Sequence, residues 1–295
     1  MRYRCLLAAT LLASTLVVTI APADAFDETR YPDFSGQWIR ARNTGLIAGG
    51  AGGIRYDTSN PPDPTNLNLG QKPPLTAEYQ AIYDENLEDM SKGGQGLDPT
   101  ANCVSPGMPR VMIAYAPFEI VVTAKITYIL MERDHDFHRH IYTDGRSFPA
   151  NMADFPQFLG YSIGRWIDEA GSGHYDLLEV ETRGLKGPRV YDASGIPLHA
   201  DNETVINERI YLDKADPNLL HDDITTIDHA LTRPWLVKHA YRRNASSEPI
   251  WFGHAVCGEA NNHVVIGGEH YFRSADGLLM PTKKGQQPPD LRYFK

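Results

Sequence analysis

The chain has 295 residues with 37 acidic and 28 basic side chains, which gives a formal net charge of −9. Hydrophobic residues make up 42% of the sequence and charged residues 22%, a composition that builds a folded core and excludes an intrinsically disordered chain. The acidic balance, without a block of Lys or Arg, argues against nucleic acid as a partner, because phosphate neutralisation needs clustered cations.

Residues 1–25 have the pattern of a secretory signal peptide. Arg2 and Arg4 form a basic start, an uncharged apolar stretch follows, and an Ala-Asp-Ala sequence ending at residue 25 supplies the small residues of a cleavage site. We therefore expect a periplasmic or secreted protein whose mature chain begins at Phe26; the alternative is an uncleaved membrane anchor. No later stretch reaches the ~20 apolar residues that a membrane-spanning helix needs.

Two cysteines, Cys103 and Cys257, would remain after cleavage. In an oxidising compartment two thiols most simply form one disulfide. The alternative is a catalytic thiol, but neither cysteine has the flanking residues of a familiar cysteine nucleophile. A disulfide is therefore the preferred interpretation.

The predicted elements begin with an irregular stretch over 26–75, which contains a glycine-rich run and a proline cluster. Thr76 is predicted to cap a helix over 77–91, whose apolar side chains recur at helical spacing. From residue 117 the period changes to two, which predicts about ten short strands, over 118–123, 126–132, 137–143, 162–168, 174–182, 204–213, 219–228, 235–242, 250–257 and 263–267.

This order of elements predicts an all-β fold. Many short strands without intervening helices favour an antiparallel meander, closed into a barrel or folded as a sandwich. We expect one N-terminal helix, a long irregular arm over 26–100 that includes this helix, and a β-barrel domain over 101–295.

Alternation along two strands places polar side chains on the inward face. Glu208 lies between Ile206 and Ile210 on the apolar face of its strand. A buried carboxylate is either paired with an inward arginine or has a raised pKa, and the second case suits general acid–base catalysis. His239 shares a face with Val237, which is compatible with a hydrogen-bonded core histidine or with a functional one.

His138 and His140 form a His-x-His pair on one face of the strand over 137–143, a spacing that suits Zn or Fe. The opposite face carries Phe137 and Ile141 and is the better core stripe, which would leave both histidines in solvent. We therefore assign no metal site and no other cofactor, and the role of the pair stays open.

Several motifs of this chain resemble those of a large group of exported bacterial proteins that has no established activity. The resemblance rests on the sequences IYTDGR over 141–146, SIGRW over 162–166 and TRPW over 232–235, and it extends to Cys257. A Gly-x-Trp opening at residues 36–38 also resembles that of lipocalin-like barrels. The resemblance implies a lipocalin-like barrel and supports a Cys103–Cys257 bridge. It implies no reaction, and it disfavours a metal role for His140, since relatives often carry arginine there.

These patterns predict an enzyme without an organic cofactor, of the lyase, isomerase or hydratase type, acting by proton transfer on a small, partly apolar or aromatic molecule. His199 would be the general base or acid, Asp144 its orienting partner and Glu208 a second acid or base. The predicted substrate-binding residues are Tyr142, Arg146, Arg165, Trp166, Trp235 and His239. The alternative is a periplasmic ligand-binding protein without catalysis. No Gly-x-Ser-x-Gly motif is present, which argues against a serine hydrolase.

Overall fold

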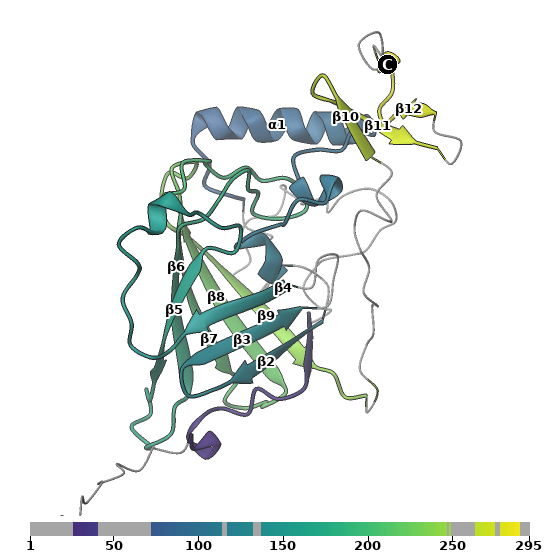
Figure 1. Ribbon diagram of the computed structural model, residues 1–295. Coiled ribbons are helices and arrows are strands. Elements are labelled where there is room, and N and C mark those ends of the chain that lie inside the picture. Colours follow the sequence, from purple (N-terminus) through teal and green to yellow (C-terminus); the bar gives the residue numbers. More distant parts are fainter. Residues whose placement is uncertain are drawn as a thin grey trace, which may run out of the picture.

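The computed structural model describes residues 26–40, 72–113, 117–131, 137–246, 248, 263–274 and 278–289. Nine strands close into a barrel in chain order (Figure 1): β1 (Gln37–Arg40), β2 (Phe118–Val122), β3 (Ile126–Met131), β4 (Phe137–Tyr142), β5 (Tyr161–Ile167), β6 (Leu177–Arg183), β7 (Val205–Leu212), β8 (Leu219–Ile227) and β9 (Trp235–Arg243). The prediction of an all-β barrel is therefore confirmed. Neighbouring strands are antiparallel, as predicted, except β4 and β5, which are parallel.

Strand β1 closes the barrel by pairing with β2 on one side and β9 on the other. The prediction of an irregular stretch over 26–75 is wrong for these four residues, because so short a segment shows no alternation of its own. Trp38 of β1 is fully buried, and its indole N–H donates a hydrogen bond to the Phe34 carbonyl at 2.9 Å. The arm before β1 is thus anchored to the barrel core.

The contact between the parallel strands β4 and β5 is short. Only Ile141↔Ser162 and Tyr142↔Ile163 are paired. Gly164 of β5 sits against β4, and a Cβ atom added to it would lie 2.6 Å from Cγ2 of Ile141. The space beside Gly164 is therefore occupied by the Ile141 side chain of β4.

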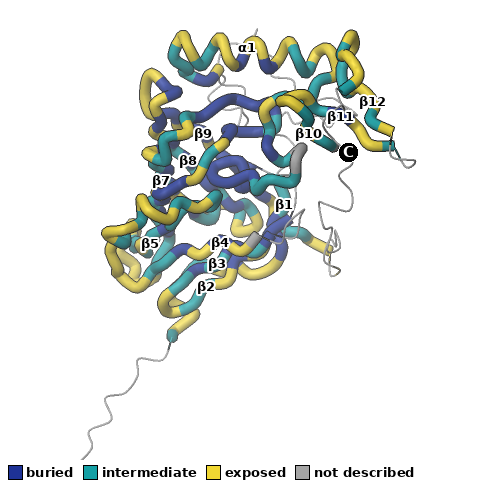
Figure 2. Tube along the Cα trace, turned by 45° about the horizontal axis from the view of Figure 1, so that its top comes forward, coloured by how far each residue is buried: buried dark blue, intermediate teal, exposed yellow. Residues whose placement is uncertain are grey.

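The helix α1 (Ala77–Ser91) lies across one end of the barrel (Figure 1). The predicted cap is confirmed, since the Thr76 hydroxyl accepts a hydrogen bond from the Tyr79 N–H at 3.4 Å. Tyr83 packs in a second core cluster with Tyr191 and Trp235, between the helix and the barrel. The other side of the helix is mostly exposed (Figure 2). No helix within the described residues is long and apolar enough to span a membrane.

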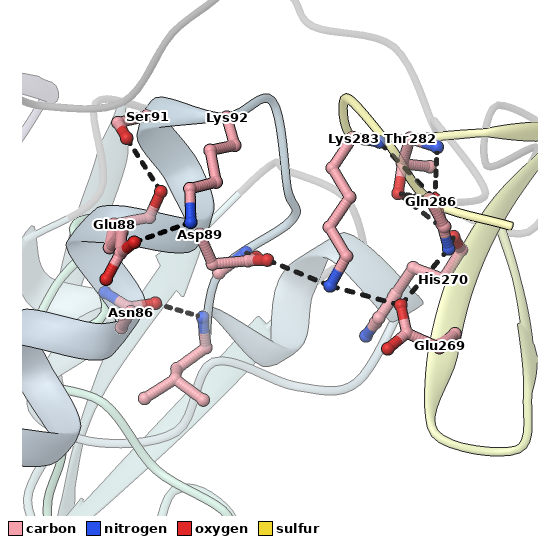
Figure 3. Close-up of polar contacts among 12 residues, drawn as sticks. Asn86, Glu88, Asp89, Ser91, Lys92, Glu269, His270, Thr282, Lys283 and Gln286 are labelled. Atoms are coloured by element: carbon pink, nitrogen blue, oxygen red, sulfur yellow. Dashed lines mark hydrogen bonds and ion pairs between the residues drawn. The ribbon is translucent and has the colours of Figure 1, made fainter.

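A separate sheet of β10 (His263–Ile266), β11 (Glu269–Arg273) and β12 (Leu279–Pro281) lies beside the C-terminal end of α1 (Figure 1). β10 was predicted, whereas β11 and β12 were not. Figure 3 shows how the sheet meets the helix: the Lys283 ammonium lies 3.2 Å from Asp89 of α1 and 3.1 Å from Glu269 of β11. Short 3-10 helices cover Glu28–Arg30, Pro99–Asn102, Arg110–Ile113 and Met152–Asp154.

Three predictions fall on residues outside the described parts of the chain. They are the signal peptide over 1–25, the strand over 250–257 and the cysteine Cys257. The signal peptide, that strand and the Cys103–Cys257 bridge therefore stay predictions.

Candidate functional site

The barrel interior contains a buried ion pair between Arg139 of β4 and Glu208 of β7. Nη1 of Arg139 lies 2.7 Å from Oε1 of Glu208, and Nη2 contacts Oε2. Their side chains are 1% and 0% exposed. The alternative weighed for Glu208, an inward arginine as partner, is thus what the structure contains. A carboxylate held by two guanidinium nitrogens is a fixed anion, which suits a structural or orienting role better than proton donation.

The same guanidinium reaches two hydroxyl groups on the strands between its own and that of Glu208. Nη2 of Arg139 donates to Oγ of Ser162 on β5 at 3.3 Å and to Oγ1 of Thr182 on β6 at 3.0 Å. The two hydroxyls are 2.8 Å apart and share a hydrogen bond. This network gives the barrel interior a polar wall, in which Arg139 contacts all three other members and the two hydroxyls also contact each other.

A carboxyl group and an imidazole lie beside this wall. Asp222 of β8 and His239 of β9 are direct partners in the antiparallel ladder. Their side chains therefore share the inward face, with Cβ atoms about 5 Å apart. Both residues are buried. Neither oxygen of Asp222 has a hydrogen-bond partner among the described residues. Buried polar atoms in native proteins are almost always hydrogen-bonded, so this carboxyl group is available to a ligand or to water.

Further polar groups approach the histidine from the α1 side. The Tyr191 hydroxyl lies 3.5 Å from Nε2 of His239, and the Tyr241 hydroxyl donates to the Met112 carbonyl at 2.5 Å. Arg40 of β1 donates through Nη1 to a backbone carbonyl at 3.0 Å, while its buried Nη2 has no partner within the described parts of the chain. The interior therefore contains a guanidinium, two phenols and an imidazole near the Asp222 carboxyl group.

Burial sets the protonation states of these groups. It raises the pKa of Asp222 well above the usual value, and the nearby carboxylate of Glu208 raises it further. Burial lowers the pKa of His239 to about 3, and the charge of Arg40 acts in the same direction. Near pH 7 the interior thus holds a neutral carboxylic acid and a neutral imidazole on neighbouring strands, one able to donate a hydrogen bond and the other able to accept one.

The predicted pair of His199 and Asp144 is not brought together by any contact among the described residues. His199 lies in the loop before β7, where Nδ1 is 3.1 Å from Oδ2 of Asp201. Asp144 lies in the turn after β4 and is bound by Arg146, with Nη2 to Oδ2 at 2.7 Å. That hydrogen bonding lowers the pKa of Asp144 to about 2. Its carboxylate is therefore committed to the arginine rather than to a histidine.

Three of the predicted substrate-binding residues line one groove, to which the predicted catalytic residue Glu208 also contributes. Arg146, Arg165 and Trp166 border a groove of about 710 Å³. Arg165 is paired with Glu179 at 2.9 Å, and the guanidinium carbon of Arg146 lies 4.0 Å from the centroid of the Tyr142 ring. Both arginines thus already have partners, which weakens the prediction that they hold an anionic group.

The remaining predicted residues are divided between the core and the surface. Trp235 is fully buried in the cluster under α1, 4.3 Å from the Tyr191 ring, so it lies in the packed core. His138 and His140 are both exposed on the outer face of β4, as their alternation with Ile141 indicated. Of the predicted site residues, Glu208 and His239 alone share the polar interior among the described residues.

Sequence reasoning missed Arg139 and Asp222. The alternation that identified Glu208 could have found both, because Asp222 stands between Leu220 and Ile224 on the buried face of β8. No protein-family model matches the chain, and no curated protein matches its sequence. The resemblance to exported bacterial proteins therefore stays a prediction.

Proposed function

We propose that the protein is an enzyme that moves a proton on a small molecule bound inside the barrel, without an organic cofactor. The observation that carries this proposal is the buried Asp222 carboxyl group, which has no hydrogen-bond partner within the described residues and faces His239 across the β8–β9 ladder. An unpaired buried carboxyl group is costly to a fold, so a site that keeps one is typical of catalysis or binding.

The arrangement suits an isomerase, lyase or hydratase. The neutral Asp222 carboxyl would give its proton to a carbonyl or hydroxyl oxygen of the substrate, while the His239 imidazole would take a proton from the neighbouring carbon. Return of a proton to another carbon would complete an isomerisation, and loss of water would complete an elimination. Aliphatic side chains such as Ile224 and the rings of Tyr191 and Tyr241 favour a partly apolar or aromatic substrate.

The proposal includes the place where the protein acts. The signal-peptide pattern over 1–25 and the expected Cys103–Cys257 bridge support an exported protein that works in the periplasm or outside the cell.

The test is hydrogen exchange at carbon. The full chain would be incubated in D₂O with a panel of small aromatic and aliphatic keto and hydroxy acids, and deuterium incorporation would be followed by NMR. We expect incorporation into at least one compound, and a loss of at least about 100-fold with Asp222→Asn.

The matched control is Asp223→Asn. Asp223 is the next residue of β8, and its carboxylate lies 3.4 Å from Nζ of Lys238 rather than in the interior cluster. Equal exchange by Asp222→Asn and by the unaltered chain would contradict the proposal. A compound that binds without exchange, and whose binding is lost with Asp222→Asn, would favour the alternative of a ligand-binding protein.

A further inference from the structure

We infer that His199, Asp201 and His229 form a binding site for a divalent transition metal ion on the surface of the protein, apart from the interior cluster. The metal-ligating atoms of these three side chains all lie within 4.8 Å of one another. Two imidazoles and one carboxylate are a donor set that zinc, ferrous iron and related ions accept, with further coordination positions left for water.

The distances at the carboxylate fit such a site. Oδ2 of Asp201 lies 3.1 Å from Nδ1 of His199 and 2.5 Å from Nδ1 of His229. Ligands at 2.0–2.1 Å from a tetrahedral zinc ion stand about 3.3 Å apart. The His199–Asp201 distance is already close to this spacing, whereas Asp201 and His229 would have to move apart by about 0.8 Å to surround an ion.

Two polar contacts converge on Nδ1 of His199. The backbone N–H of Asp201 donates to this nitrogen at 3.1 Å, so the nitrogen is a hydrogen-bond acceptor, and a bound ion would take the place of that N–H. The Asp201 carboxylate faces the same nitrogen with lone pairs of its own. Two such atoms repel each other unless a cation, either a metal ion or an added proton, balances them.

A buried network holds the two histidine-bearing loops in place. Asp228 accepts hydrogen bonds from the His199 N–H of the first loop at 2.9 Å and from the Ala230 N–H of the second loop at 2.8 Å. Asp228 and Ala230 are the two residues that flank His229 in the sequence. The other oxygen of Asp228 accepts from the hydroxyl of Thr204. One carboxylate thus positions the backbone of both loops, a second layer of support that is typical of metal sites.

The helix α1 adds a third element to the site. The Thr76 N–H at its start donates to the Ala230 carbonyl at 2.9 Å, and the Tyr79 ring lies 5.7 Å from the His199 ring. His229 remains 62% exposed. An ion bound here would therefore reach solvent on one side, which leaves room for water or an external ligand.

The test is zinc binding by the full chain after treatment with a chelator, measured by equilibrium dialysis with elemental analysis, and repeated with cobalt to read the coordination from its visible spectrum. We expect one ion per chain. His229→Ala and Asp201→Asn should each weaken binding by at least about 100-fold.

Two controls match these variants in residue type. Glu203→Gln removes a carboxylate that lies 3.8 Å from Nε2 of His229, the ring nitrogen away from Asp201. The double variant His138→Ala/His140→Ala removes two exposed histidines of β4. Both should bind zinc as the unaltered chain does.

Binding that survives His229→Ala, or that is lost in the His138/His140 variant, would overturn the inference. Absence of zinc binding to the unaltered chain would overturn it as well. Neither result touches Asp222 or His239, so the proposed function would stand or fall on its own test.

Discussion

Glu208 and Arg209 are neighbours on β7, yet their ion pairs lie in opposite surroundings. Glu208 points into the barrel and pairs with Arg139, with both side chains withdrawn from solvent. Arg209 points outward and pairs with Glu169 and Glu179, and its own side chain is 44% exposed. In water the outer pair gains little from forming, whereas the inner pair cannot lose one member without leaving a charge stranded in the core.

The largest effect is expected from the inner pair. Arg139→Ala would leave the Glu208 carboxylate buried without its cation, and we expect the free energy of unfolding to fall by about 3–5 kcal/mol. Denaturant titration measures this loss. The double variant Arg139→Met/Glu208→Leu should recover most of the stability, because it removes both charges. A double variant as unstable as the single one would mean that packing, rather than the stranded charge, dominates.

An effect that depends on pH is expected from Asp192. This carboxyl group is buried, and burial raises its pKa to about 7, against hydrogen bonds from Ser194 that act to lower it. The folded protein then binds this proton more tightly than the unfolded chain does. Stability from this group is therefore greatest at acid pH and is lost as the pH rises from about 4 to about 7.

Asp192→Asn removes that dependence. The unfolding free energy of the variant, relative to the unaltered chain, should rise by about 1.4 kcal/mol per pH unit between pH 4 and 7 and stay level above pH 7. Asp144→Asn is the surface control: the pKa of Asp144 is about 2 in the folded protein and about 3.9 in the unfolded chain, so the difference should be flat above about pH 5. A flat profile for Asp192→Asn would show that the group is not kept protonated.

The smallest effect is expected from the outer pair. Arg209→Ala should lower the free energy of unfolding by no more than about 1 kcal/mol, because water and salt screen exposed charges. Raising the salt concentration should reduce the effect further. If Arg209→Ala lowered the free energy of unfolding as much as Arg139→Ala does, burial would not explain the difference between the inner and the outer ion pair.

Much of this architecture could be predicted from local patterns. Period-two alternation located β2 to β9 and turned Glu208 and His239 inward, because a strand with one buried face must alternate. β1 could not be found in this way, since its strand character depends on β2 and β9 rather than on its own four residues.

The site was predicted less well, for a physical reason. Alternation gives the face of a side chain but not its neighbours on distant strands, so the Arg139–Glu208 contact across 69 residues of chain was not predictable. The assignment of His199 to Asp144 has another cause: it passed over a carboxylate in the same loop, because the neighbour of His199 is Asp201, two residues away.

Because the contact between β4 and β5 is short, the Arg139 side chain helps to hold these two strands together. With only two paired positions, this seam has few backbone hydrogen bonds to resist opening. The guanidinium starts on β4 and ties together Ser162, Thr182 and Glu208, one on each of the next three strands. One interior side chain therefore links the two strands of this short contact to the two strands that follow them.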